Sequence, residues 1–166
     1  MRVTSTGVVD GAIMERYGAK GSEFIEGMPS LSIPFEIVDA PEGTVSFAVI
    51  LEDYDAVPVC GFDWIHWILC DLKRTSVSEG ESRGSDDFTE GCNSWHGIGD
   101  VLSRETATGY GGMAPPDKTH RYTLSVYALD CELGLGKGFF LNELMFGMEG
   151  HVLDHARLVG TYEPTG

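Results

Sequence analysis

The chain has 166 residues, 42% of them apolar, which suffices for one domain with a substantial core. Its 26 acidic residues against 11 basic ones give a formal net charge of −15. That charge argues against nucleic-acid binding and against stable attachment to anionic membranes. A small anion can still bind, because salt screens distant charges and local donors decide affinity inside a pocket.

The chain also lacks the sequence signals of membrane insertion and export. No run reaches the roughly 18 consecutive apolar residues that a membrane span needs. The first residues lack the charged-then-apolar layout of a signal peptide. We therefore expect a single cytoplasmic domain over residues 1–166.

The four cysteines are scattered, without a Cys-x-x-Cys pair or a histidine at zinc-finger spacing. They are Cys60, Cys70, Cys92 and Cys131. An even count allows two disulfides, but a domain of this size does not need them. We expect free, buried thiols, no metal site and no cofactor.

Short strands and turns are expected over the first 45 residues, which glycines punctuate. The segment 31–38 has strand composition, but Pro34 within it predicts an edge or a bend. The apolar run 47–51 predicts a buried strand, and a second strand is expected over 65–72. Residues 73–90 are polar and predict a long surface loop.

The last third of the chain combines two strand patterns with one helix pattern. Residues 119–129 alternate between apolar and polar side chains and predict a strand. Residues 158–162 predict a short final strand. A stripe at helical spacing predicts one helix of about four turns, formed by Leu141, Leu144, Met148, Val152 and His155. The sum is a mainly β, antiparallel protein with a C-terminal α-helix.

Polar side chains gather at or beside the ends of these strands. Asp53 and Asp55 follow one strand, His66 lies within the next, and His120 and Tyr122 open a third. An aspartate pair on a turn is usually a cap, and a histidine in an aromatic strand is usually a hydrogen-bonded core residue. Together, however, carboxylates can orient imidazoles so that their N–H groups face an oxyanion. Backbone N–H groups of a Gly-Gly loop can add to these donors.

Four segments resemble motifs of the phosphatidylethanolamine-binding proteins, a family that includes the Raf kinase inhibitor proteins. Glu52-Asp-Tyr-Asp-Ala56 resembles their Asp-Pro-Asp-Ala-Pro motif, and Trp64-Ile-His-Trp67 resembles their Trp-x-His strand. Tyr110-Gly-Gly, Pro115-Pro116 and Thr119-His-Arg-Tyr122 together resemble their Gly-x-Pro-Pro…His-Arg-Tyr motif. Residues 148–162 resemble the C-terminal helix and last strand of bacterial and archaeal members. The likeness runs from about residue 8 to residue 162.

Two departures fall in the first motif. Tyr54 stands where the family has proline, and the inserted Val57 displaces the final proline to Pro58. The shape of the pocket mouth, and so the size of the ligand, therefore does not follow from the resemblance.

The resemblance implies a β-sandwich built on a large antiparallel sheet, with a small anion pocket at one edge. Members of the family hold phosphate, acetate or a phosphoethanolamine head group there without known turnover. The implied ligand-binding residues are Asp53, Asp55, His66, Gly111, Pro116, His120 and Tyr122. The sequence thus predicts a non-catalytic binding protein for a small anion.

Two other functions stay open at this point. A His-Asp pocket can perform acid–base chemistry, and His151 and His155, four residues apart, could share a metal ion. Against an enzyme, the chain has neither a Gly-x-Ser-x-Gly motif nor a zinc-ligand spacing. The resemblance also implies a regulatory inhibitor of a protein kinase or protease, and a homodimer, although no residue names a protein partner.

Overall fold

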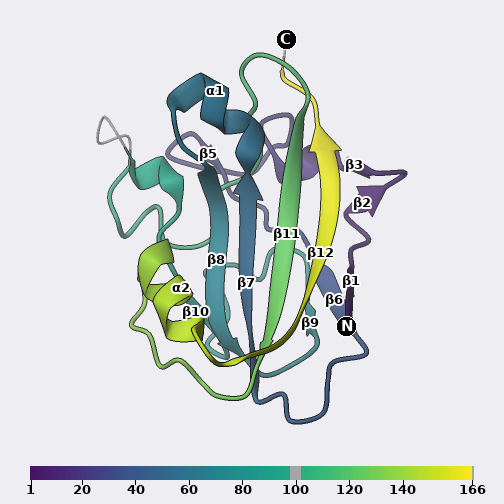
Figure 1. Ribbon diagram of the computed structural model, residues 1–166. Coiled ribbons are helices and arrows are strands. Elements are labelled where there is room, and N and C mark those ends of the chain that lie inside the picture. The colour runs from purple at the N-terminus through teal and green to yellow at the C-terminus, as the bar shows by residue number, and fades with distance from the viewer. Residues whose placement is uncertain (98–101, 166) are drawn as a thin grey trace.

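A seven-stranded sheet forms the centre of the structure (Figure 1). The computed structural model describes residues 1–97 and 102–165. The strands of this sheet are β2 (Val8–Val9), β3 (Ala12–Ile13), β7 (Ser46–Asp53), β8 (Trp64–Leu72), β10 (Thr89–Glu90), β11 (His120–Leu129) and β12 (Val152–Tyr162). Their order is β10-β8-β7-β11-β12-β3-β2, and neighbours are antiparallel except β12 and β3.

A second, smaller sheet packs against one face of the large one. It consists of β1 (Arg2–Thr4), β6 (Phe35–Val38) and β9 (Ser76–Val77), with β6 in the middle. Phe35, Ile37 and Val77 of this sheet share one buried cluster with Leu51 and Leu124 of the large sheet. Two facing sheets with their apolar sides together form the predicted β-sandwich. A separate hairpin joins β4 (Phe24–Ile25) to β5 (Met28–Pro29).

The opposite face of the large sheet is covered in part by the helix α2 (Leu141–Met148), which lies beside β8 and β10 in Figure 1. Leu144 and Met148 of this helix pack with Ile50 and Ile68 of the sheet. Because β7 has a layer on each side, all eight of its residues are buried. This explains its unbroken apolar run, which is typical of a strand covered on both faces.

The helix predicted over residues 141–155 is too long. It ends at Met148, and Val152 and His155 belong to β12. Gly147 and Gly150 each weaken a helix by about 1 kcal/mol relative to alanine. Gly150 has a φ of +79° and turns the chain, after which β12 pairs along the whole of β11. The hydrogen bonds of this long ladder outweigh the helical spacing, so the final strand also begins before the predicted residue 158.

Two strand assignments also differ from the prediction. Pro34 precedes β6 rather than interrupting it, and β6 is the middle strand of its sheet rather than an edge. The segment 73–90 contains β9 and β10 and buries Val77 and Phe88. Some of its polar side chains form hydrogen bonds inside the protein rather than facing solvent. The buried Glu90 accepts from Trp67 Nε1 at 2.7 Å and from two groups of the segment itself.

All four cysteines are free, as expected, but Cys60 and Cys131 are only half-buried. In the part of the chain that the structure describes, the shorter helical elements are the α-helix α1 (Val57–Cys60) and three 3₁₀ helices. The 3₁₀ helices span Glu15–Tyr17, Tyr54–Ala56 and Ser94–His96. Among the described residues, no helix has the length and apolar character needed to cross a bilayer.

Replacing Leu144 by alanine should lower the free energy of unfolding by about 2–5 kcal/mol, because the side chain is fully buried between α2 and the sheet. Urea denaturation followed by circular dichroism measures the change. Phe146 lies on the same helix with 68% of its surface exposed, so Phe146→Ala is the matched control and should change stability by less than about 0.5 kcal/mol. Equal losses in both variants would contradict the packing described here.

Candidate functional site

Topology brings the predicted site residues to one edge of the large sheet. β7 is antiparallel to both β8 and β11, so its end lies beside the starts of these two strands. The register pairs Asp53 with Trp64 and Glu52 with Thr123. Asp53 therefore stands between His66 on one side and His120 on the other. Asp53 and His120 are in contact although they lie 67 positions apart in the sequence.

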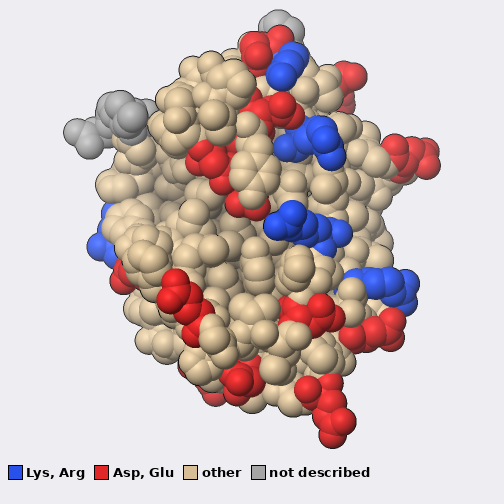
Figure 2. Space-filling view, viewed as in Figure 1, with Lys and Arg blue, Asp and Glu red and all other residues tan. Residues whose placement is uncertain are grey.

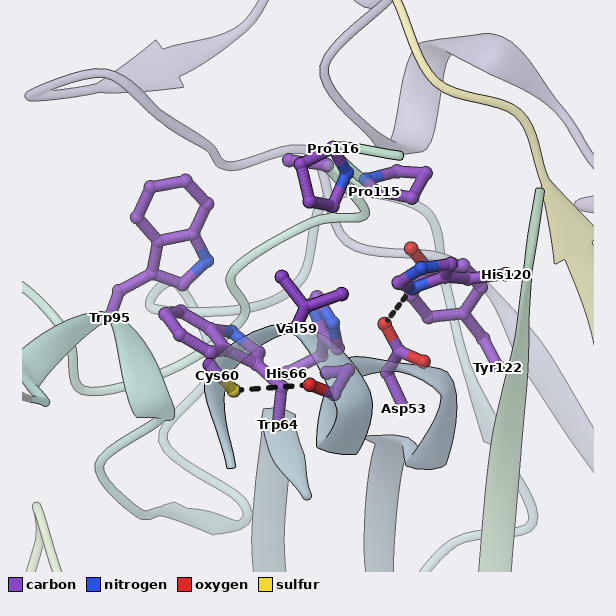
Figure 3. Close-up of a pocket in the computed structure, with 12 residues that line it drawn as sticks. Asp53, Val59, Cys60, Trp64, His66, Trp95, Pro115, Pro116, His120 and Tyr122 are labelled. Carbon is purple, nitrogen blue, oxygen red and sulfur yellow. Dashed lines mark hydrogen bonds and ion pairs between the residues drawn. The ribbon is translucent and has the colours of Figure 1, made fainter. Parts of the chain in front are cut away.

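A cavity of about 230 Å³ opens at this edge, next to α1 (Figure 3). Its walls come from the turn after β7, the starts of β8 and β11, the 3₁₀ helix at residues 94–96, and the Pro-Pro loop. The lining residues are Asp53, Ala56, Val59, Cys60, Trp64, His66, Trp95, Ala114, Pro115, Pro116, His120 and Tyr122. Most of these are apolar, so the few polar groups among them decide which ligand chemistry fits.

His120 is held between two carboxylates. Its Nδ1 lies 2.7 Å from Asp53 Oδ2, and its Nε2 lies 2.8 Å from Asp117 Oδ1. Burial alone would lower the pKa of His120, but hydrogen bonds and attraction to the two carboxylates outweigh it and raise the pKa. Since carboxylates accept at both ring nitrogens, the arrangement favours a charged imidazolium. Asp117 is half exposed, and its hydrogen bond to His120 lowers the pKa of its carboxyl.

His66 is in a different state. Its Nδ1 lies 2.6 Å from the carbonyl oxygen of Gly111, which can only accept, so Nδ1 carries the hydrogen. Burial lowers the pKa of His66 despite the nearby carbonyl groups. The ring is therefore neutral, and its Nε2 is a hydrogen-bond acceptor. This corrects the expectation that both imidazoles present N–H donors to a ligand, because His66 directs its only N–H to the backbone.

Two of the predicted site residues do not line the cavity. Asp55 accepts from the backbone N–H of Arg121 at 2.9 Å and pairs with Lys118 Nζ at 3.4 Å. The backbone hydrogen bond is the main cause of its lowered pKa. Asp55 thus joins the turn after β7 to the start of β11, a supporting role that an aspartate pair on a turn often has.

Gly111 also acts outside the cavity. Its N–H donates to the carbonyl of His66 at 2.8 Å, and its own carbonyl accepts from the His66 ring. The N–H of Gly112 donates to Pro29. The Gly-Gly loop therefore has no free N–H for an anion, contrary to expectation. A Cβ at Gly111 would lie 2.6 Å from Trp95 Cδ1, so glycine is needed there for close packing.

Sequence reasoning missed Trp95, which lines the cavity, and Asp117, which contacts His120 from outside the lining. Trp95 lies on a short 3₁₀ helix within a stretch that looked irregular, and its distance in sequence from the other motifs gave no signal. Asp117 precedes His120 by three residues, a spacing that could have been noticed. Tyr54, at the position of the family proline, donates to Glu52 at 2.6 Å and does not line the cavity. Val57 starts α1, which supplies Val59 and Cys60 to the wall.

Comparison with known proteins identifies the family that the sequence motifs resemble. The family model described as phosphatidylethanolamine-binding protein matches residues 4–163. The chain belongs to the phosphatidylethanolamine-binding protein family. A UPF0098 protein of Chlamydia pneumoniae is 33% identical, covering 98% of this chain and 99% of that protein. The uncharacterized protein YxkA of Bacillus subtilis is 41% identical over 77% of this chain and 79% of its own length.

Solved structures from this family share the fold. The crystal structure of the homologue CT736 from Chlamydia trachomatis aligns with a TM-score of 0.78 and 30% identity, covering 98% of this chain and 96% of that one. YbcL of Escherichia coli aligns with a TM-score of 0.77 at 24% identity, covering 98% and 97%. The second likeness speaks for the fold alone. Both alignments cover nearly the whole chain and so support the fold as a whole.

The histidine pair considered for a metal ion does not form. His151 lies in the turn after α2 and contacts Asp130 at 2.8 Å, whereas His155 lies in β12 and stacks on Tyr127. The helix that would have placed them on one face has already ended. His151, Asp130 and Cys131 do have ligand atoms within 4.8 Å of one another, at the far end of β11 from the cavity.

Replacing Asp53 by asparagine should lower the pKa of His120, because it removes a buried negative charge 2.7 Å from the ring while keeping an acceptor there. Titration of the ring by NMR measures the change. Asp117→Asn should lower the pKa less, since that side chain is 50% exposed and solvent screens it. A His120 pKa unchanged in the Asp53→Asn variant would contradict the coupling.

Proposed function

We propose that this protein binds a small oxyanion, either phosphate or a phosphoethanolamine head group, in the cavity beside Asp53 and His120, and does not turn it over. One observation carries the proposal: the imidazolium of His120 already donates from Nε2 to an oxyanion, the carboxylate of Asp117. That carboxylate belongs to a half-exposed side chain, and a ligand oxygen can replace it at the same nitrogen.

The formal charge of −15 does not oppose such a site. Charges more than about 10 Å away are largely screened in salt, whereas a buried imidazolium acts at short range in a medium of low dielectric constant. Figure 2 shows basic side chains close to acidic ones over β11 and β12, and a largely uncharged surface between α1 and α2. The charged N–H of His120 therefore acts on a ligand at short range, whatever the charge of the rest of the surface.

The apolar walls support a ligand with a small organic part. Val59, Trp64, Trp95 and the two prolines leave room for a few carbon atoms beside the polar floor. The thiol of Cys60 is directed at the backbone carbonyls of Ala56 and Phe62, both at 3.3 Å, rather than at a general base that could activate it. A binding role therefore fits better than catalysis. Inhibition of a kinase or protease stays a prediction of the family resemblance.

Phosphate affinity should fall as pH rises from about 6 to about 9. The raised pKa of His120 means that the imidazolium persists below that pKa and loses its proton above it, so the charged donor is lost on going up in pH. Isothermal titration calorimetry at the two pH values measures the effect. In the variant His120→Gln the amide does not titrate, so any pH dependence of the affinity that remains comes from the ionisation of phosphate itself. An equal pH dependence in both proteins would count against His120.

The double variant His66→Ala, His120→Ala should bind phosphate at least about tenfold more weakly, since a hydrogen bond to a charged group is worth about 1.5–3 kcal/mol. The matched control is His151→Ala, His155→Ala, which removes two exposed imidazoles at a distance from the cavity. Calorimetry under the same conditions compares the two. Unchanged affinity in the first variant would refute the proposed function.

A further inference from the structure

Two polar groups of the cavity are hydrogen-bond acceptors, a carboxylate and an imidazole nitrogen. Asp53 lies in the floor with 3% of its surface exposed, and its Oδ1 has no partner among the described residues. The second acceptor is Nε2 of the neutral His66, whose Nδ1 carries the ring's hydrogen. Buried carboxylate oxygens are normally hydrogen-bonded, so an unpaired one at a cavity points to a missing donor.

Several donors near these acceptors are already engaged. His120 directs one N–H to Asp53 and the other to Asp117. The N–H groups of Gly111 and Gly112 bond to backbone carbonyls. The remaining lining donors without a partner among the described residues are the hydroxyl of Tyr122 and Nε1 of Trp95.

A fully deprotonated oxyanion fits this floor poorly. Once it has taken the place of Asp117 at His120, it still faces the carboxylate of Asp53 and the lone pair of His66, both of which repel its oxygens. An oxyanion that retains one O–H group can instead donate that hydrogen to Asp53 or His66. It then satisfies an acceptor that is costly to leave unpaired, at about 1–3 kcal/mol for a buried group.

We propose, on the basis of the proposed function, that the site selects oxyanions carrying a proton, namely inorganic phosphate and phosphate monoesters in their singly charged forms, over sulfate and phosphodiesters, and that Asp53 is the residue that selects them. A monoester keeps this proton below its second pKa of about 6. Sulfate has the same tetrahedral shape as phosphate but no hydrogen at neutral pH. A phosphodiester has no P–OH group to donate. Free phosphoethanolamine with a singly ionised phosphate is therefore the better ligand, and the diester phosphate of an intact lipid is the poorer one.

Calorimetry on the full chain at about pH 5.5, below the second pKa of about 6 of a phosphate monoester, and at constant ionic strength tests the proposal with two matched pairs of probes. The first pair is inorganic phosphate and sulfate, and the second is methyl phosphate and dimethyl phosphate. We expect the protonated member of each pair to bind at least about tenfold more tightly. Phosphoethanolamine against glycerophosphoethanolamine then distinguishes the free head group from the diester found in a lipid.

The variant Asp53→Asn should reverse the preference. An asparagine oxygen still accepts from His120, while the amide N–H now offers a donor to the ligand, so sulfate should gain affinity relative to phosphate. Asp55→Asn removes the same charge nearby, but its carboxylate faces Lys118 and Arg121, so the ratio should stay as in the unmodified protein. Circular dichroism shows whether each variant is folded.

The outcomes separate this inference from the function on which it rests. If phosphate and sulfate bind the unmodified protein equally well, the selection by Asp53 is wrong and oxyanion binding stands. If equal binding of sulfate is accompanied by proton uptake, the protein itself supplies the missing donor at Asp53 or His66, and the inference is again overturned. If no oxyanion binds, the proposed function fails as well.

Discussion

The buried contact between Asp53 and His120 is the interaction on which the site depends. It joins the last residue of β7 to the first residue of β11, at the point where the antiparallel register brings the two strand ends together. A carboxylate or an imidazolium removed from water alone would be strongly destabilising, so each needs the other there. The pair fixes the ring of His120 and with it the direction of the outer N–H toward Asp117.

The two histidines have opposite states although they line the same cavity. His120 touches carboxylates and is favoured as a cation, whereas His66 touches a carbonyl and is favoured as a neutral ring. Burial acts on both in the same direction, so the difference comes from the charge of the partner. The proposed selection between ligands that carry a proton and ligands that do not rests on this difference.

Much of the scaffold could be predicted from sequence because strands and their ends have local signals. The apolar run before Asp53 and the alternation after His120 marked two central strands, and the motif resemblance joined them. Hydrogen-bond partners have no such signal. Whether His66 donates to a ligand or to Gly111, and whether Asp55 faces the cavity or Arg121, depends on loops that only the folded chain places. The prediction that the helix extends to residue 155 was wrong for a related reason. Pairing with β11 outweighs the helical spacing of Val152 and His155.

The most direct measurement is a titration of the ¹⁵N-labelled histidine rings with inorganic phosphate, followed by NMR. The account predicts saturable shifts at the ring nitrogens of His66 and His120, with none at His151 and His155, which lie away from the cavity. Saturation by phosphate without a change at His66 and His120 would contradict it.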